Sequence, residues 1–151
     1  MNGREIVLIA NIFLLASTLS ACRDKGRIEM NADGSAESLD SLGKELDLTF
    51  PVSARLLGVE RESGMDDMVR LKVEMNAADL AGFLERSPID PASFRSGPRG
   101  FLGQDRGFWD PHRAAQLRTA QAIVAGHRAL NIGVDETRAG VVTLYIVNHG
   151  T

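Results

Sequence analysis

The sequence predicts an α+β fold, with an antiparallel sheet of about five or six strands and two short helices on one face. Two observations predict it. Several short segments alternate apolar and polar residues with the period of a half-buried strand, and turn-forming residues separate them. Two other segments carry the signals of a helix start. The 151-residue chain suits one such domain with an extension.

Residues 1–21 are predicted to form a signal peptide. Arg4 precedes fourteen uncharged, mostly apolar residues, 6–19. A helix of that length spans about 21 Å, whereas the hydrocarbon core of a bilayer is roughly 30 Å thick. A permanent transmembrane helix is therefore the poorer interpretation. A basic start, a short apolar run and small residues at its end are typical of a secretory signal peptide.

The end of this run reads Leu19-Ser20-Ala21-Cys22 and holds the one cysteine of the chain. It resembles the lipobox of bacterial lipoproteins. The resemblance implies that diacylglycerol alkylates the Cys22 thiol, that the chain is cut before Cys22, and that the new amino group is acylated. Two or three acyl chains anchor a protein stably, whereas one anchors it marginally. The alternatives are an ordinary signal peptide with an incidental cysteine, or a buried apolar helix.

The resemblance covers residues 1–22 and implies a place in the cell envelope, with the membrane as first partner through the lipid on Cys22. Arg23, rather than aspartate, follows the cysteine. In enteric-type lipoproteins this favours the outer membrane, facing the periplasm of a Gram-negative host. The remainder of the chain resembles the small uncharacterised lipoproteins of bacterial envelopes. A net charge of −3 argues against a nucleic-acid partner, because phosphate binding favours a basic face.

Residues 22–44 are predicted to be a lipid-anchored flexible tether. They are rich in Asp, Glu, Ser, Gly and Lys and hold few large apolar side chains, so they bury too little surface to offset the entropy of ordering. A coil of that length holds the domain about 25 Å from its anchor. The alternative is a short helix capped at Ser38.

A single domain is expected over 45–151. Alternation in 45–50 predicts a first strand, and 52–61 and 68–75 are the next two candidates. The Ser, Gly and Asp residues of 62–67 predict a turn, which would join the second and third strands as an antiparallel hairpin.

The segment 76–87 is predicted to be the first helix. Asn76 is a good N-cap residue, and Asp79 favours the positive end of the helix dipole. Pro88 cannot continue the helix. Its apolar stripe, at helical spacing, is Leu80, Phe83 and Leu84.

After a loop over 87–109, Asp110 and Pro111 predict the start of a second helix that runs to about Arg118. Strands are expected near 119–125 and 128–135. The surest strand is 141–148, which is dense in β-branched residues. The alternative that stays open is one long helix over 114–130, because Ala, Gln, Arg and Leu favour helix.

Catalytic and metal-binding motifs are missing from the sequence, so no metal site, cofactor or catalytic residue is expected. The three histidines do not fall in a zinc-binding spacing, and one cysteine excludes an intramolecular disulfide. The alternative function is a lipid-anchored envelope hydrolase whose acid–base residues meet only in the folded chain. Such a site would draw on Asp110, His112 and His127.

The loop over 87–109 is the strongest candidate for a binding site. It holds four of the seven aromatic residues that follow the signal peptide, interleaved with arginines. Both types are enriched at binding hot spots and suit carboxylates, glycans or lipid headgroups. We therefore expect a non-catalytic lipoprotein that binds an envelope partner through this loop. One alternative is that the aromatic residues of the loop fold back over the sheet and form part of the core. Another is that the protein has a structural role and no discrete binding site. The candidate partner-binding residues are Phe94, Arg95, Arg99, Phe101, Arg106, Phe108 and Trp109.

Overall fold

The computed structural model describes residues 37–64, 67–96 and 100–150. The predicted signal peptide, Cys22, the first part of the predicted tether and Arg99 lie outside the described residues. Within the described part of the chain, no helix combines the length and the apolar character needed to cross a membrane.

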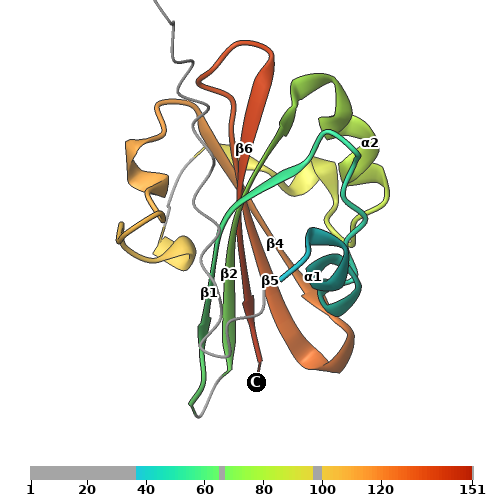
Figure 1. Ribbon diagram of the computed structural model, residues 1–151, viewed down its shortest axis with the longest axis vertical. Helices are drawn as coiled ribbons and strands as arrows, with labels where there is room; N and C mark the ends of the chain where they lie inside the picture. The colour runs from blue at the N-terminus through green and yellow to red at the C-terminus, as the bar shows by residue number, and fades with distance from the viewer. Residues whose placement is uncertain (1–36, 65–66, 97–99, 151) are drawn as a thin grey trace, which may run out of the picture.

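The sheet has six antiparallel strands in the order β1-β2-β6-β5-β4-β3 (Figure 1). This confirms the predicted fold class. The C-terminal strand β6 lies between β2 and β5, and seven of its nine residues are buried, which explains its nearly continuous apolar sequence. The strands are β1 (Arg55–Glu62), β2 (Met68–Asn76), β3 (Arg95–Ser96), β4 (Leu117–Val124), β5 (Arg128–Asp135) and β6 (Val141–His149).

Two helices, α1 (Leu39–Leu46) and α2 (Leu80–Glu85), cover one face of the sheet, here called the helix face (Figure 1). The predicted stripe of α2 is buried as expected, although Asn76 makes no capping hydrogen bond and a 3₁₀ turn, Ala77–Asp79, precedes the helix. Alternate residues of the strands meet the two helices and form the main core. Its fully buried members include Leu42, Leu46, Leu71, Val73, Phe83, Leu130, Ile132, Val134, Leu144 and Ile146.

The predicted strand over 45–50 is wrong, and the folded part begins before the expected boundary at residue 44. Ser38 caps α1 by accepting a hydrogen bond from the Ser41 amide at 3.1 Å, as in the alternative interpretation. The helix ends at Asp47, whose φ of 57° turns the chain. The leucines of this segment are buried as an alternating strand would bury them, but leucines at 39, 42 and 46 also fit a helical stripe. Packing on the sheet selected the helix.

The helix predicted from Asp110 to about Arg118 is also wrong beyond its first turn. Only a 3₁₀ turn, Pro111–Arg113, forms, and β4 begins at Leu117. The carboxylate of Asp110 makes no capping bond, because Lys72 and Tyr145 bind it instead. The alternative helix over 114–130 is contradicted as well, since β4 and β5 pair along this stretch.

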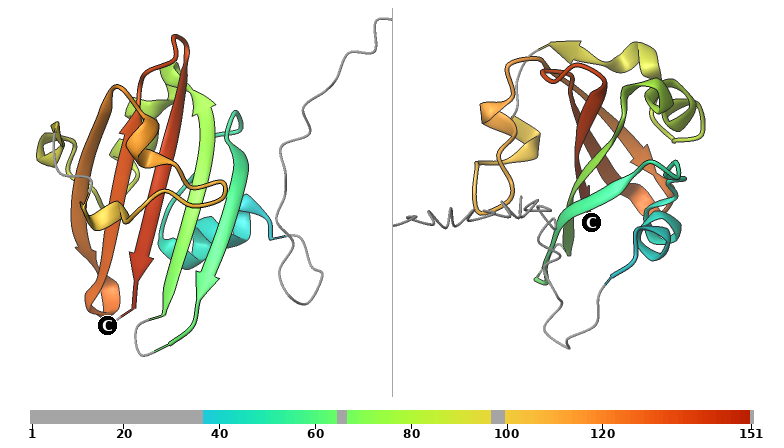
Figure 2. Two further views of the ribbon diagram at one scale, coloured as in Figure 1. Left: turned by 90° about the vertical axis from the view of Figure 1, so that its left-hand side faces the viewer. Right: turned by 45° about the horizontal axis from the view of Figure 1, so that its top comes forward.

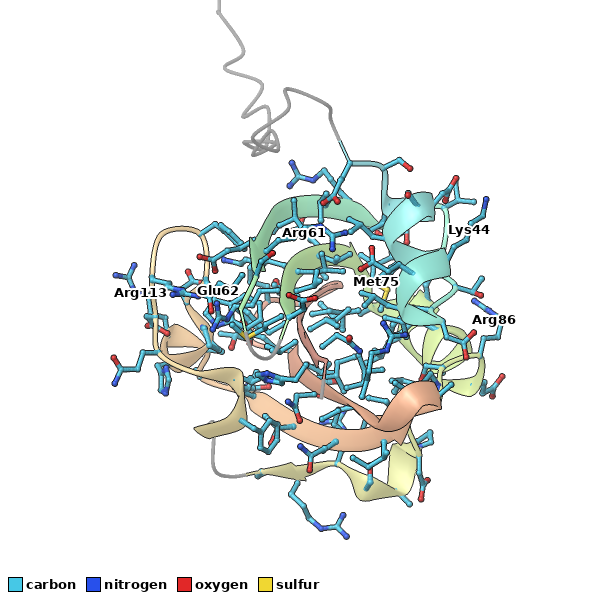
Figure 3. All side chains as sticks on the ribbon, turned by 90° about the horizontal axis from the view of Figure 1, so that it is seen from below. Lys44, Arg61, Glu62, Met75, Arg86 and Arg113 are labelled. Carbon is cyan, nitrogen blue, oxygen red and sulfur yellow. The ribbon has the colours of Figure 1, made fainter. Side chains whose placement is uncertain are left out.

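The opposite face of the sheet is called the loop face, because segment 100–116 crosses it. Figure 2 shows this segment over the upper part of the face, whereas no described element crosses the lower part. Seen from below in Figure 3, Glu62 and Arg113 lie on this side of the sheet, and Lys44 and Arg86 lie on the helix side. A second, smaller core packs beneath the segment, and it consists of Met68, Leu102, Trp109, Ala114, Leu117, Tyr145 and Val147.

Candidate functional site

Strand register arranges the loop face in rows, because residues directly opposite one another in antiparallel strands share a face. An upper row, across β1, β2, β6, β5 and β4 in turn, contains Gly58, Lys72, Tyr145, Gly133 and Thr119. Segment 100–116 covers this row.

Two glycines of the upper row make room for the segment. A Cβ atom on Gly58 would overlap the ring of Phe108, and one on Gly133 would lie 2.7 Å from Cδ1 of Leu102. Glycine inside a strand often marks such a close approach. Phe108 and Leu102 therefore dock on the sheet at positions that other residues would block.

Trp109 lies between these two anchors and is completely buried. Its ring meets Tyr145 edge-to-face at 5.2 Å between centroids, and its Nε1 donates a hydrogen bond to the carbonyl of Leu102 at 2.9 Å. Both the apolar surface and the polar atom of the indole are thus satisfied within the protein. Trp109 is a core residue of the loop face.

A charged cluster beside Trp109 also holds the segment on the sheet. Oδ1 of Asp110 accepts hydrogen bonds from Lys72 Nζ at 2.5 Å and from the Tyr145 hydroxyl at 2.8 Å. Burial, and then the hydrogen bond to Asp110, raise the pKa of Tyr145 well above its usual value. The phenol of Tyr145 therefore stays protonated and donates a hydrogen bond to Asp110, which makes it unsuitable as a general base.

A second charged cluster fastens the tip of the segment. Arg106 forms ion pairs with Glu60 at 3.0 Å and with Glu62, and Nη1 of Arg70 bonds the same two carboxylates at 3.1 and 2.8 Å. Two positive and two negative groups balance one another. Segment 100–116 is thus attached by aromatic packing in its centre and by charges on both sides.

These contacts determine which of the predicted partner-binding residues are accessible to a partner. Phe94 and Trp109 are buried, which contradicts their assignment to an exposed binding face. Phe94 belongs to the main core, and the guanidinium of Arg118 lies 5.3 Å from its ring centre. The aromatic residues of the loop therefore fold back on the sheet, as in the alternative interpretation.

The other predicted binding residues remain accessible to different degrees. Phe101 and Phe108 are half-buried, and Arg106 is exposed but ion-paired. Arg95 is exposed, and its Nη1 donates to the carbonyls of Ala92 and Phe94 at 2.7 and 2.9 Å. Among the described candidates, Phe101 lines a groove.

Asp110 and His112, two residues of the alternative hydrolase, have other partners. Asp110 binds Lys72 and Tyr145, whereas Nδ1 of His112 lies 3.0 Å from Oδ1 of Asp105. His127 lies in the 3₁₀ turn between β4 and β5, on a different element from Asp110 and His112. Among the described residues, no three His, Cys, Asp or Glu side chains are placed to hold a metal ion.

The groove occupies the uncovered lower part of the loop face. Its volume is about 350 Å³, which lies in the range of ligand-binding pockets. The rim comes from Gly100, Phe101, Leu102 and Gly103 of the covering segment. The floor comes from the two rows below Tyr145, and its lining residues are Met68, Arg70, Gln121, Ala129, Asn131, Val147 and His149.

Polar residues from three strands line this floor. Nε2 of Gln121 donates a hydrogen bond to Oδ1 of Asn131 at 2.6 Å, and Asn131 is only 2% exposed. The guanidinium of Arg70 lies in the same row, two strands away from Asn131. Sequence reasoning missed both carboxamides, although the alternation within 128–135 places Asn131 on the same face as Ala129 and Gly133.

A larger hollow of about 420 Å³ lies beside α1, but one continuous segment, 39–50, lines it. Its charged residues, Asp40, Lys44 and Asp47, are exposed. This hollow is a crease between the helix and the turn that follows it. The groove on the loop face, which gathers polar side chains from separate strands, is the better candidate site.

Comparison of the chain with protein-family models, with curated proteins and with solved structures finds no match.

Proposed function

We propose that this protein is a lipid-anchored lipoprotein of the bacterial cell envelope whose domain binds a partner without catalysing a reaction. The observation that carries the proposal is the Leu19-Ser20-Ala21-Cys22 motif at the end of a short apolar run. Lipid on Cys22 would hold the domain at the membrane surface, in the outer membrane of a Gram-negative host.

The loop face is the proposed binding face. On the opposite side, α1 and α2 cover the sheet, whereas the lower part of the loop face carries a groove lined by polar residues from three strands. Among the predicted partner-binding residues, Phe101 keeps this role as one wall of the groove. Asp110 and Tyr145, which could have served acid–base chemistry, are engaged in holding segment 100–116.

The anchor is tested by growing cells that express the protein with an alkyne-labelled fatty acid. We expect the wild-type protein to incorporate the label and Cys22→Ala to incorporate none. Labelling that persists in Cys22→Ala would refute the lipoprotein assignment. Separation of inner and outer membranes then tests the location.

The binding face is tested by photo-crosslinking in cells. A photoreactive amino acid replaces Gln121 in the groove or, as the matched control, Glu85 at the exposed end of α2. Crosslinked products that depend on the groove position support the proposal. Equal yields at the two positions, or none at Gln121, contradict it.

A further inference from the structure

We propose that the groove on the loop face binds a neutral glycan, with the Gln121 carboxamide contacting hydroxyl and N-acetyl groups and Phe101 contacting an apolar sugar face. This inference depends on the proposed function, because it specifies the ligand of the same face. It follows from the geometry of the groove, its hydrogen-bonding groups and its charge balance.

The groove runs across the strands. Arg70, Val147, Asn131 and Gln121 are paired in register on β2, β6, β5 and β4. Three strand spacings separate the ends of this row, or about 14 Å. The row below it contributes Met68, His149 and Ala129. The floor therefore alternates apolar and polar side chains, with Arg70 and Gln121 at the two ends of the upper of these rows.

Donors outnumber acceptors among these polar groups. Gln121 is exposed and keeps a second N–H group and its carbonyl oxygen after bonding Asn131, whereas Asn131 is almost completely buried and holds the Gln121 carboxamide in place. Both bonds from Arg70 to Glu60 and Glu62 use Nη1. Hydroxyl groups accept and donate, and N-acetyl carbonyls accept, so an acetylated sugar satisfies this set.

Charge argues for a neutral ligand. No carboxylate is among the residues that line the groove. The positive charge of Arg70 is already balanced by its ion pairs with Glu60 and Glu62. An anion placed beside Arg70 would also meet these two carboxylates at short range, which is unfavourable. A cation would find no lining carboxylate to bind.

The position of the groove argues against a peptide. Extended peptides commonly add a strand to a sheet edge, and proline-rich peptides need a groove lined by several aromatic rings. This groove lies on the face of the sheet rather than along an edge strand, and Phe101 is the aromatic residue in its lining. An exposed side-chain amide, that of Gln121, together with one aromatic wall fits a hydroxyl-rich ligand better.

The test is saturation-transfer NMR on the full chain in detergent, with the β-1,4-linked trimer of N-acetylglucosamine at millimolar concentration. A capped alanine tripeptide serves as the competing probe. We expect transfer to the glycan, and binding about three- to ten-fold weaker in Gln121→Ala, which is the effect of losing one neutral hydrogen bond. Gln121 is exposed, and the fluorescence of the buried Trp109 reports whether each variant is folded.

The matched control is Gln104→Ala, which removes an exposed glutamine from the covering segment outside the groove and should leave binding unchanged. Transfer to the tripeptide alone, no transfer to either probe, or equal binding by Gln121→Ala and the wild type would overturn the inference. If groove-dependent crosslinks form in cells under any of these outcomes, the glycan assignment fails while the proposed function stands.

Discussion

Replacing Trp109 with alanine distinguishes a core role of segment 100–116 from an exposed binding role. Trp109 is completely buried and its Nε1 is bonded within the protein. A buried aromatic side chain removes about 150–250 Å² from water, which at about 25 cal/mol per Å² corresponds to roughly 4–6 kcal/mol. Measured tryptophan-to-alanine changes in cores cost about 3–5 kcal/mol. We therefore expect a loss of about 4 kcal/mol in the free energy of unfolding.

The assay is urea unfolding followed by far-ultraviolet circular dichroism, because Trp109→Ala removes the one tryptophan of the chain. With a slope of about 1.5 kcal/mol per molar urea, the midpoint should fall by roughly 2–3 M. Gln104→Ala in the same segment is the control, and an exposed substitution of this kind changes stability by about 0.5 kcal/mol or less.

A third variant keeps the test informative if Trp109→Ala does not fold. Trp109→Phe retains a ring but loses the bond to the Leu102 carbonyl, so a smaller loss of about 1–3 kcal/mol is expected. If Trp109→Ala costs no more than Gln104→Ala, the segment does not act as core and the reasoning from burial is refuted.

Two further predictions concern the contacts beneath the segment. Because the pKa of Tyr145 is raised in the folded protein, its contribution to stability is complete below about pH 10 and declines above it by about 1.4 kcal/mol per pH unit. When the free energy of unfolding is measured over this alkaline range, it should fall more steeply with pH for the wild type than for Tyr145→Phe. Parallel curves for the two proteins would contradict a raised pKa of Tyr145. Gly133→Ala should cost about 1–3 kcal/mol, because the new methyl group would lie 2.7 Å from Leu102. Gly64→Ala, which meets no atom within 4 Å, is its control, and equal melting temperatures for the two variants would show that the segment does not dock on Gly133.

Local pattern was a sufficient guide wherever one secondary structure satisfied the apolar residues. Alternation in β2 and the dense apolar sequence of β6 could fit only strands, and the structure has strands there. The stripe of α2 was equally clear. The pattern of 45–50 was ambiguous because Leu46 and Leu48 alternate, while Leu42 and Leu46 also share a helical face.

The candidate site was less predictable than the fold. Counting aromatic and arginine residues identified segment 87–109 as unusual, but the count could not tell a binding face from a core layer. Gly58 and Gly133 decide that question, and their effect depends on which strands lie beneath Phe108 and Leu102. Likewise, Asp110 was predicted to cap a helix, but in the folded chain its carboxylate bonds Lys72, which lies 38 residues earlier in the sequence.

The sequence by itself determined the α+β class, because it follows from the order of apolar and polar residues along short stretches. The resemblance of residues 19–22 to a lipobox also comes from the sequence alone, and the lipid anchor stays a prediction. Only the tertiary structure decided which side of the sheet segment 100–116 covers and which polar residues share the uncovered groove. Strand register determined which polar residues meet in the groove, because Gln121, Asn131 and Arg70 lie on three different strands. Which side chains become neighbours across a sheet depends on how the strands align, and the local sequence of one strand does not specify that alignment.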